Sequence, residues 1–232
     1  MKDIKLMKDN LKLLIFDFDG TLADTTSHIL NCIKKCIIKF NLRRLSNEDL
    51  AVYSGATLSE AMQELGATEE QLQEIKSYYT SIFFEDVSDI HLYKHVAQVL
   101  NELKNNGYTL AVATNRRRKM ITLLLDLLGI SSVFDKIVCE TDVNNKKPNA
   151  DMVKLILEEL NYTKDETLVL GDTKYDILMS KNANCKSCYV CYSTETDDSI
   201  ISLHPDLVIH DFQELIRLLL NKDIVSKGIG VN

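Results

Sequence analysis

The hydrophobic pattern of the chain changes its period near residue 26. Residues 11–16, LKLLIF, form a continuous apolar run of the kind expected for a strand buried on both faces. From residue 26 to residue 40, apolar side chains recur at helical spacing instead. Two later segments open with the spacing of a helix capping box. These pairs are Thr57 with Glu60 and Thr68 with Gln71. Residues 26–86 are therefore predicted to form consecutive helices without a strand.

From residue 87 onward, strand-like and helix-like segments alternate. The predicted strands have the sequences YTLAVAT, KIVC, TLVLGD, SCYVCY and DLVI. The predicted helices span 93–105, 117–128, 149–160, 175–183 and 211–220. Such alternation predicts an α/β fold with a Rossmann-like parallel sheet and helices on both faces. We expect residues 1–23 and 87–232 to form this core, and residues 24–86 to form an inserted, all-helical cap domain.

Composition narrows the classes of function. The chain has 232 residues, 45% of them hydrophobic, and its net charge is −7. An acidic chain is a poor candidate for binding nucleic acid or an acidic membrane. No segment approaches the roughly 20 apolar residues that a membrane span needs, and the first ten residues lack the apolar core of a secretion signal. We therefore expect a cytoplasmic protein.

Two groups of potential metal ligands are better explained as structural. Cys185, Cys188 and Cys191 have a spacing that occurs in metal sites, but they lie in a strand-like segment without a nearby fourth ligand. Cysteine is often fully buried, so core packing is the favoured interpretation. His91 and His95 are four residues apart without a third ligand, which favours a solvated helix face.

Polar side chains follow several predicted strands at the point where each strand ends. The four strings are DFDGT from residue 17, TN from residue 114, KKP from residue 146 and GDTKYD from residue 171. In an open parallel sheet, ligands bind at the carboxyl ends of the strands. Asp17, Asp19 and Asp172 would then meet, and three carboxylates suit Mg2+, a hard cation that prefers oxygen ligands. Lys147 and Thr114 would remain to hold a phosphate.

These four strings, in this order, resemble the haloacid dehalogenase-like superfamily. The helical insertion after the first string is similar to that of the phosphoglycolate phosphatase-like branch, which carries a helical cap. The resemblance covers nearly the whole chain. It implies phosphoryl transfer through an aspartyl phosphate, with Mg2+ as cofactor and a small phosphorylated metabolite as partner.

The resemblance also implies roles for the acids and the lysine. Asp17 would be the nucleophile, and Asp19 would protonate the leaving oxygen and later deprotonate water. Lys147 would neutralise charge on the nucleophile and the phosphoryl group. Asp17, the backbone carbonyl of Asp19 and Asp172 would hold the metal. Asp176 would accept hydrogen bonds from metal-bound water or from Lys147, or would simply favour the N-terminus of its helix.

The remaining candidates bind phosphate or select the substrate. Gly20 would let backbone amides approach the phosphate. Thr114 would donate its hydroxyl to a phosphoryl oxygen, with Asn115 beside it. The candidates for substrate selection belong to the predicted cap, namely Arg44, Tyr53, Ser54 and Gly55. The arginine triplet 116–118 is expected to start a solvated helix with two of its members, and an arginine here could also recognise an anionic substrate.

Three functions remain open at this point. The first is a Mg2+-dependent phosphatase acting on a small phosphate monoester, such as phosphoglycolate or a sugar phosphate, or on pyrophosphate. The second is a phosphosugar mutase of the β-phosphoglucomutase kind, which would use the same catalytic residues. The third is a non-catalytic phosphate-binding regulatory protein, which the complete set of acids and lysine disfavours. We rank the phosphatase first because the predicted cap shows no obvious clamp for a sugar phosphate.

Overall fold

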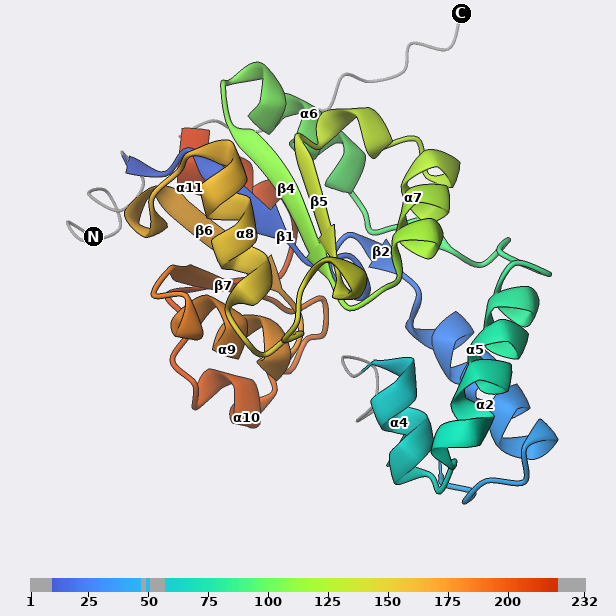
Figure 1. Cartoon of the computed structure of the whole chain (residues 1–232). Coiled ribbons are helices and arrows are strands. Elements are labelled where there is room, and N and C mark those ends of the chain that lie inside the picture. The colour runs from blue at the N-terminus through green and yellow to red at the C-terminus, as the bar shows by residue number, and fades with distance from the viewer. Residues whose placement is uncertain (1–9, 47–48, 51–56, 221–232) are drawn as a thin grey trace, which may run out of the picture.

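A computed structural model of the chain describes residues 10–46, 49–50 and 57–220 (Figure 1). Its centre is a six-stranded sheet in the order β5-β4-β1-β6-β7-β8, in which every neighbouring pair is parallel. The strands are β5 (Lys136–Cys139), β4 (Thr109–Thr114), β1 (Leu13–Phe16), β6 (Thr167–Gly171), β7 (Lys186–Val190) and β8 (Leu207–Ile209). This confirms the predicted α/β class, and it places the strand of residues 13–16 in the middle of the sheet.

Helices cover both faces of this sheet. On one face, α8 (Asp151–Leu160) and α9 (Lys174–Asn182) pack on alternate side chains of the central strands. On the other face lie α6 (Val96–Asn105), α7 (Arg118–Leu127) and α11 (Gln213–Leu220). Short helical turns occupy the connections, namely η1 (Ser131–Val133), η2 (Glu140–Asp142), η3 (Lys164–Glu166) and α10 (Asp198–Ile201). Because both faces are covered, β1 is entirely apolar and buried.

Three described helices, α2 (Thr26–Lys39), α4 (Leu58–Glu64) and α5 (Glu69–Phe83), form a group beside the sheet (Figure 1). Both predicted capping boxes are present, at Thr57 with Glu60 and at Thr68 with Gln71. Helix α2 packs on α5 through buried side chains at helical spacing, including Ile33 and Ile37. In the described part of the chain, no helix is long and apolar enough to cross a membrane.

The chain leaves for these helices and returns from them through two short strands. Strand β2 (Ala23–Asp24) pairs with β3 (His91–Leu92) in an antiparallel sheet of its own. The predicted solvated helix face for His91 and His95 is therefore wrong. His91 lies in β3, and His95, with φ of 68°, is the N-cap of α6 and binds Asp211. A strand of two residues is too short to show an alternating pattern. The predicted helix therefore began at residue 93, whereas α6 begins at Val96.

The three cysteines that lie close together in the sequence are buried free thiols, which agrees with the prediction that they pack in the core. Cys185, Cys188 and Cys191 belong to three different hydrophobic clusters. Burial raises the pKa of the Cys185 thiol to about 12. Because each side chain is packed into a separate part of the core, these three residues do not form a common metal site.

Candidate active site

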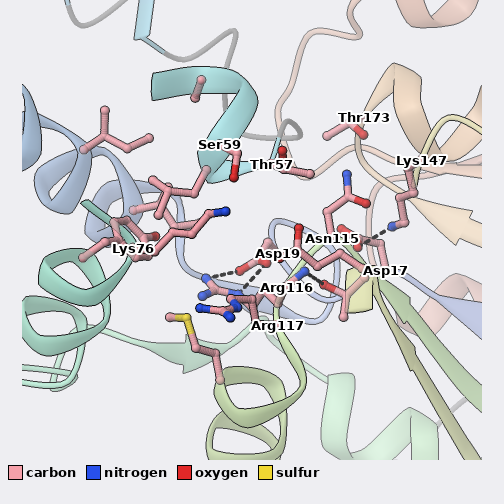
Figure 2. A pocket seen from close by; sticks show the side chains of 18 of the residues that line it. Asp17, Asp19, Thr57, Ser59, Lys76, Asn115, Arg116, Arg117, Lys147 and Thr173 are labelled. Carbon is pink, nitrogen blue, oxygen red and sulfur yellow. Dashed lines mark hydrogen bonds and ion pairs between the residues drawn. The ribbon is translucent and has the colours of Figure 1, made fainter. Parts of the chain in front are cut away.

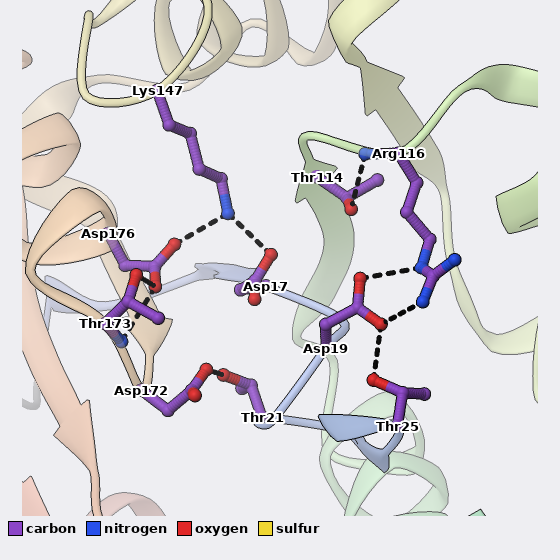
Figure 3. Close-up of polar contacts among 10 residues, drawn as sticks. All are labelled: Asp17, Asp19, Thr21, Thr25, Thr114, Arg116, Lys147, Asp172, Thr173 and Asp176. Atoms are coloured by element: carbon purple, nitrogen blue, oxygen red, sulfur yellow. Dashed lines mark hydrogen bonds and ion pairs between the residues drawn. The ribbon is translucent and has the colours of Figure 1, made fainter. Parts of the chain in front are cut away.

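The candidate site lies where the central strands end, and the topology explains why its residues meet. Strand β1 lies between β4 and β6 in the sheet. Asp17 and Asp19 follow β1, Thr114 is the last residue of β4, and Asp172 comes directly after β6. Parallel strands end at the same edge, so these side chains gather there (Figure 3).

Lys147 joins two buried carboxylates in this cluster. Its Nζ donates to Oδ1 of Asp17 and to Oδ1 of Asp176, at 2.6 Å in each case. Burial alone would lower the pKa of Lys147, but Asp17 and Asp176 together raise it above its ordinary value. Lys147 is therefore a fixed positive charge beside the proposed nucleophile. Asp176 was also considered as a residue that favours the N-terminus of its helix. The structure agrees with that interpretation too, because Asp176 and Thr173 form the capping box of α9.

A single positive charge does not offset all of the acids gathered here. Oxygen atoms of Asp17, Asp172 and Asp176 lie within 4.8 Å of one another. Burial raises the pKa of Asp17 to about 7, against the opposing effect of Lys147. Burial and then the neighbouring Asp17 raise the pKa of Asp172 well above its ordinary value. Carboxylate oxygens enclosed in this way fit a hard divalent cation.

The hydrogen bonds separate the three acids by role. Both oxygens of Asp176 already accept hydrogen bonds, one from Lys147 and the other from the amide and hydroxyl of Thr173. Asp172 accepts one hydrogen bond from the hydroxyl of Thr21, at 2.7 Å. Asp17 and Asp172 are therefore better placed to bind a cation than Asp176, which supports Lys147.

Two glycines make room for two of these acids. A Cβ at Gly20 would lie 2.1 Å from a carboxylate oxygen of Asp172, and a Cβ at Gly171 would lie 2.2 Å from Cγ of Asp176. Real Cβ atoms essentially never come this close to other heavy atoms. Gly20 also has φ of 75°, which L side chains rarely adopt. Sequence reasoning assigned Gly20 to phosphate binding and missed Gly171. In the structure, the absence of a side chain leaves room for the carboxylate of Asp172 at Gly20 and for that of Asp176 at Gly171.

Asp19 is held by a different set of partners. Its Oδ2 accepts from Nε of Arg116 at 2.7 Å, and its Oδ1 accepts from Nη2 of Arg116 at 2.6 Å (Figure 3). The hydroxyl of Thr25 donates to Oδ1 at 2.5 Å. The backbone amide of Arg116 donates to the hydroxyl of Thr114, at 3.2 Å. Arg116 is thus a buried member of the site, not part of a solvated helix start, whereas Arg117 and Arg118 are exposed.

These groups line a pocket that the sheet edge and the three helices enclose together (Figure 2). Asp17, Asp19, Thr114, Asn115 and Lys147 contribute from the sheet side. The residues that sequence reasoning missed come mainly from α4, from the cap of that helix and from α5. They include Thr57, Ser59, Lys76, Tyr79 and Thr80. Their signals in the sequence were the helical pattern and, for Thr57, the capping-box spacing, and neither shows which side chains face the site.

The predicted substrate-selecting residues are not brought to this pocket by the described structure. Arg44 is exposed and lies outside the set of residues that lines the pocket. Tyr53, Ser54 and Gly55 lie outside the described residues. In the described part of the helical segment, the residues that line the pocket belong to α2, to α4 with its N-cap, and to α5.

Both the sequence and the fold of this chain are similar to those of known proteins. The model of the haloacid dehalogenase-like hydrolase family matches residues 14–190. Pyrophosphatase PpaX of Oceanobacillus iheyensis is 27% identical over 210 residues, which are 90% of this chain and 97% of that protein. Phosphoglycolate phosphatase of Vibrio parahaemolyticus is 27% identical over 224 residues, and the match covers 92% of this chain and 98% of that protein. A haloacid dehalogenase-like hydrolase from Streptococcus pneumoniae has the same fold, with a TM-score of 0.77, 20% identity, and 90% and 98% covered.

Proposed function

The chain belongs to the haloacid dehalogenase-like hydrolase family, and we propose that it is a Mg2+-dependent phosphatase acting on a small phosphate monoester or on pyrophosphate. One observation carries the proposal. Asp17 lies at the end of the central strand, hydrogen-bonded to Lys147, clustered with Asp172 and lining the same pocket as Asp19. This set combines a nucleophile, a fixed positive charge, an acid and oxygen ligands for a cation.

In the first step, a carboxylate oxygen of Asp17 attacks the phosphorus atom of the substrate. The bond from this oxygen to phosphorus forms as the bond from phosphorus to the leaving oxygen breaks, and the leaving oxygen keeps the electron pair. Asp19 gives that oxygen a proton. Lys147 offsets negative charge beside the reacting group from its position against Asp17.

In the second step, water attacks the phosphorus atom of the aspartyl phosphate. Asp19, now ionised, takes a proton from the water, and the bond from phosphorus to Asp17 breaks to release phosphate. The hydroxyl of Thr114 and the amide of Asn115 line the pocket where they can bind phosphoryl oxygens. Asp17, Asp172 and the backbone carbonyl of Asp19 would hold Mg2+, which would offset phosphoryl charge and orient the substrate.

The test measures phosphate release from a panel containing pyrophosphate, phosphoglycolate, sugar phosphates and p-nitrophenyl phosphate. Asp17→Asn should abolish turnover of every substrate, because a neutral amide cannot form the aspartyl phosphate. Asp24→Asn is the matched control, since Asp24 follows the same string but does not line the pocket. Turnover by folded Asp17→Asn above ~10% of wild type would remove Asp17 from the nucleophile role.

The same assay separates the phosphatase from a mutase. A phosphosugar mutase would convert one sugar phosphate into its isomer, because a sugar hydroxyl instead of water would accept the phosphoryl group. Isomer formation that greatly exceeds phosphate release would replace the phosphatase proposal with the mutase.

A further inference from the structure

Arg116 connects the proposed acid of the site with the helical segment above it. Only 8% of the residue is exposed, and its guanidinium binds both oxygens of Asp19. The same guanidinium stacks on the ring of Phe83, with its carbon 4.6 Å from the ring centre. Phe83 belongs to α5, so Arg116 lies between the edge of the sheet and that helix.

Helix α5 presents one face to this region. Lys76, Tyr79, Thr80 and Phe83 have the spacing of a single helical face. The first three line the pocket, and the fourth packs on Arg116. In Figure 2, Lys76 and Lys147 lie at opposite ends of the pocket, with Asp19 and Arg116 between them. The pocket therefore has a phosphoryl end at Lys147 and a second end at α5.

The charges at the second end differ from those at the first. Each carboxylate of the lining has a cation beside it: Lys147 for Asp17 and Asp176, Arg116 for Asp19, and Lys146 for Glu140. Within the described part of the chain, Lys76 and Arg117 line the pocket without an ion pair. The end of the pocket away from Lys147 thus has an excess of positive charge.

Arg116 can bind a second anion while it holds Asp19. A guanidinium carries five N–H donors in a plane, and it binds carboxylates and phosphates through pairs of them. Asp19 takes two of these donors, one on Nε and one on Nη2. The remaining donors belong to the same planar group, so an anion bound there would lie next to Asp19, the proposed proton donor to the leaving oxygen.

We propose that Arg116, assisted by Lys76, binds a negative charge on the leaving group, so that the preferred substrates carry a carboxylate or a second phosphate there. This inference rests on the proposed phosphatase activity and narrows its substrate class. A neutral leaving group, such as a sugar, would leave the positive charge at this end of the pocket unused. Arg116 is then a binding residue for the substrate and a positioning residue for Asp19.

The experiment compares substrates that differ only in the charge of the leaving group. Phosphoglycolate is paired with its neutral amide, pyrophosphate supplies a phosphate leaving group, and p-nitrophenyl phosphate serves as a generic ester. The ratio of kcat/KM for phosphoglycolate over kcat/KM for its amide is the quantity of interest. The variants are Arg116→Met, Arg116→Lys and Lys76→Met. The control is Arg118→Met, because Arg118 pairs with Asp142 and lies outside the pocket lining.

Arg116→Met should lower this ratio by about 10- to 100-fold, the size expected for a lost charge-assisted hydrogen-bonded pair. Arg116→Lys should retain part of the preference because it keeps the charge but not the planar pair of donors. Lys76→Met should lower the ratio by a smaller factor, and Arg118→Met should leave it unchanged. Pyrophosphate should follow phosphoglycolate in every variant.

Two results would overturn the inference: an unchanged ratio in Arg116→Met, whether or not both substrates of the pair lose activity equally, or the same change in Arg118→Met. If Arg116→Met does not fold, as judged by thermal unfolding, unchanged ratios in both Arg116→Lys and Lys76→Met overturn it equally. Hydrolysis of p-nitrophenyl phosphate by wild type, and its loss in Asp17→Asn, tests the phosphatase itself. Failure of the inference is therefore distinguishable from failure of the proposed function.

Discussion

The ammonium group of Lys147 lies 2.6 Å from a carboxylate oxygen of Asp17, and both residues are buried. Lys147 follows β5 and a helical turn, whereas Asp17 follows β1, so the contact joins segments that are 130 residues apart. Asp176 shares the same ammonium group. Removing either kind of charge from this arrangement leaves the other buried and uncompensated, which is costly.

Replacing Lys147 should therefore affect stability as well as turnover. Lys147→Met leaves Asp17 and Asp176 without their cation, and it should lower the free energy of unfolding by about 3–5 kcal/mol. Lys146→Met is the matched control, because its 3.3 Å ion pair with Glu140 is partly exposed and should be worth less than about 1 kcal/mol. Urea unfolding of both variants measures this difference. Equal free energies of unfolding in the two variants would show that the buried ion pair stabilises the fold no more than the partly exposed one.

A second prediction separates crowding from backbone strain at glycine. Gly20 and Gly129 have φ of 75° and 69°, but only a Cβ at Gly20 would collide with another residue, Asp172. Gly129→Ala should cost about 1 kcal/mol from the backbone alone. Gly20→Ala should cost clearly more and should also reduce turnover, because Asp172 must move. Similar unfolding free energies and full activity in both variants would contradict this explanation.

Much of the sheet edge could be predicted from the sequence. The apolar run of β1 and the later alternation of strands and helices specify a parallel sheet, and a parallel sheet brings its strand ends together. This reasoning alone brings Asp17, Thr114 and Asp172 to the same edge of the sheet.

Other features could not be predicted because nothing local encodes them. The pair of Asp19 with Arg116 joins residues 97 positions apart, and a run of three arginines does not reveal which member is buried. Strands of two residues, such as β3, have no detectable period. The helical pattern of α5 predicts an amphipathic helix, but it does not show that Lys76 faces a pocket.

The pH dependence of stability should include a contribution from Asp206. Burial raises the pKa of its carboxyl group, but hydrogen bonds from Lys186 and from the amide and hydroxyl of Ser187 lower it below its ordinary value of 3.8. The unfolded chain therefore binds this proton more readily than the folded one. The stabilisation is complete above the ordinary value and is lost as the pH falls through the lower, folded value.

Asp206→Asn should consequently lower the free energy of unfolding at neutral pH by about 1–2 kcal/mol, the worth of hydrogen bonds to a charged group. The difference from wild type should narrow at a pH below the ordinary value of 3.8, where the unfolded wild-type chain takes up its proton. Urea titrations of both proteins at the two pH values test this. A difference that stays constant, or grows in acid, would assign the effect to packing instead of ionisation.

The last prediction concerns the cation that the acids at the sheet edge would hold. Activity should require Mg2+, and Ca2+ should inhibit, because Ca2+ takes more ligands and often binds carboxylates through both oxygens. If both oxygens of Asp17 bound the ion, neither would be left to attack phosphorus.

Phosphate release should be assayed in EDTA, in Mg2+ and in Ca2+, and thermal unfolding should be followed in the same buffers. Mg2+ should raise the Tm of wild type by mass action, and this rise should be lost in Asp172→Asn but kept in Asp24→Asn. Full activity in EDTA, or an equal Mg2+-dependent rise in Asp172→Asn, would show that the cluster of Asp17 and Asp172 is not a metal site.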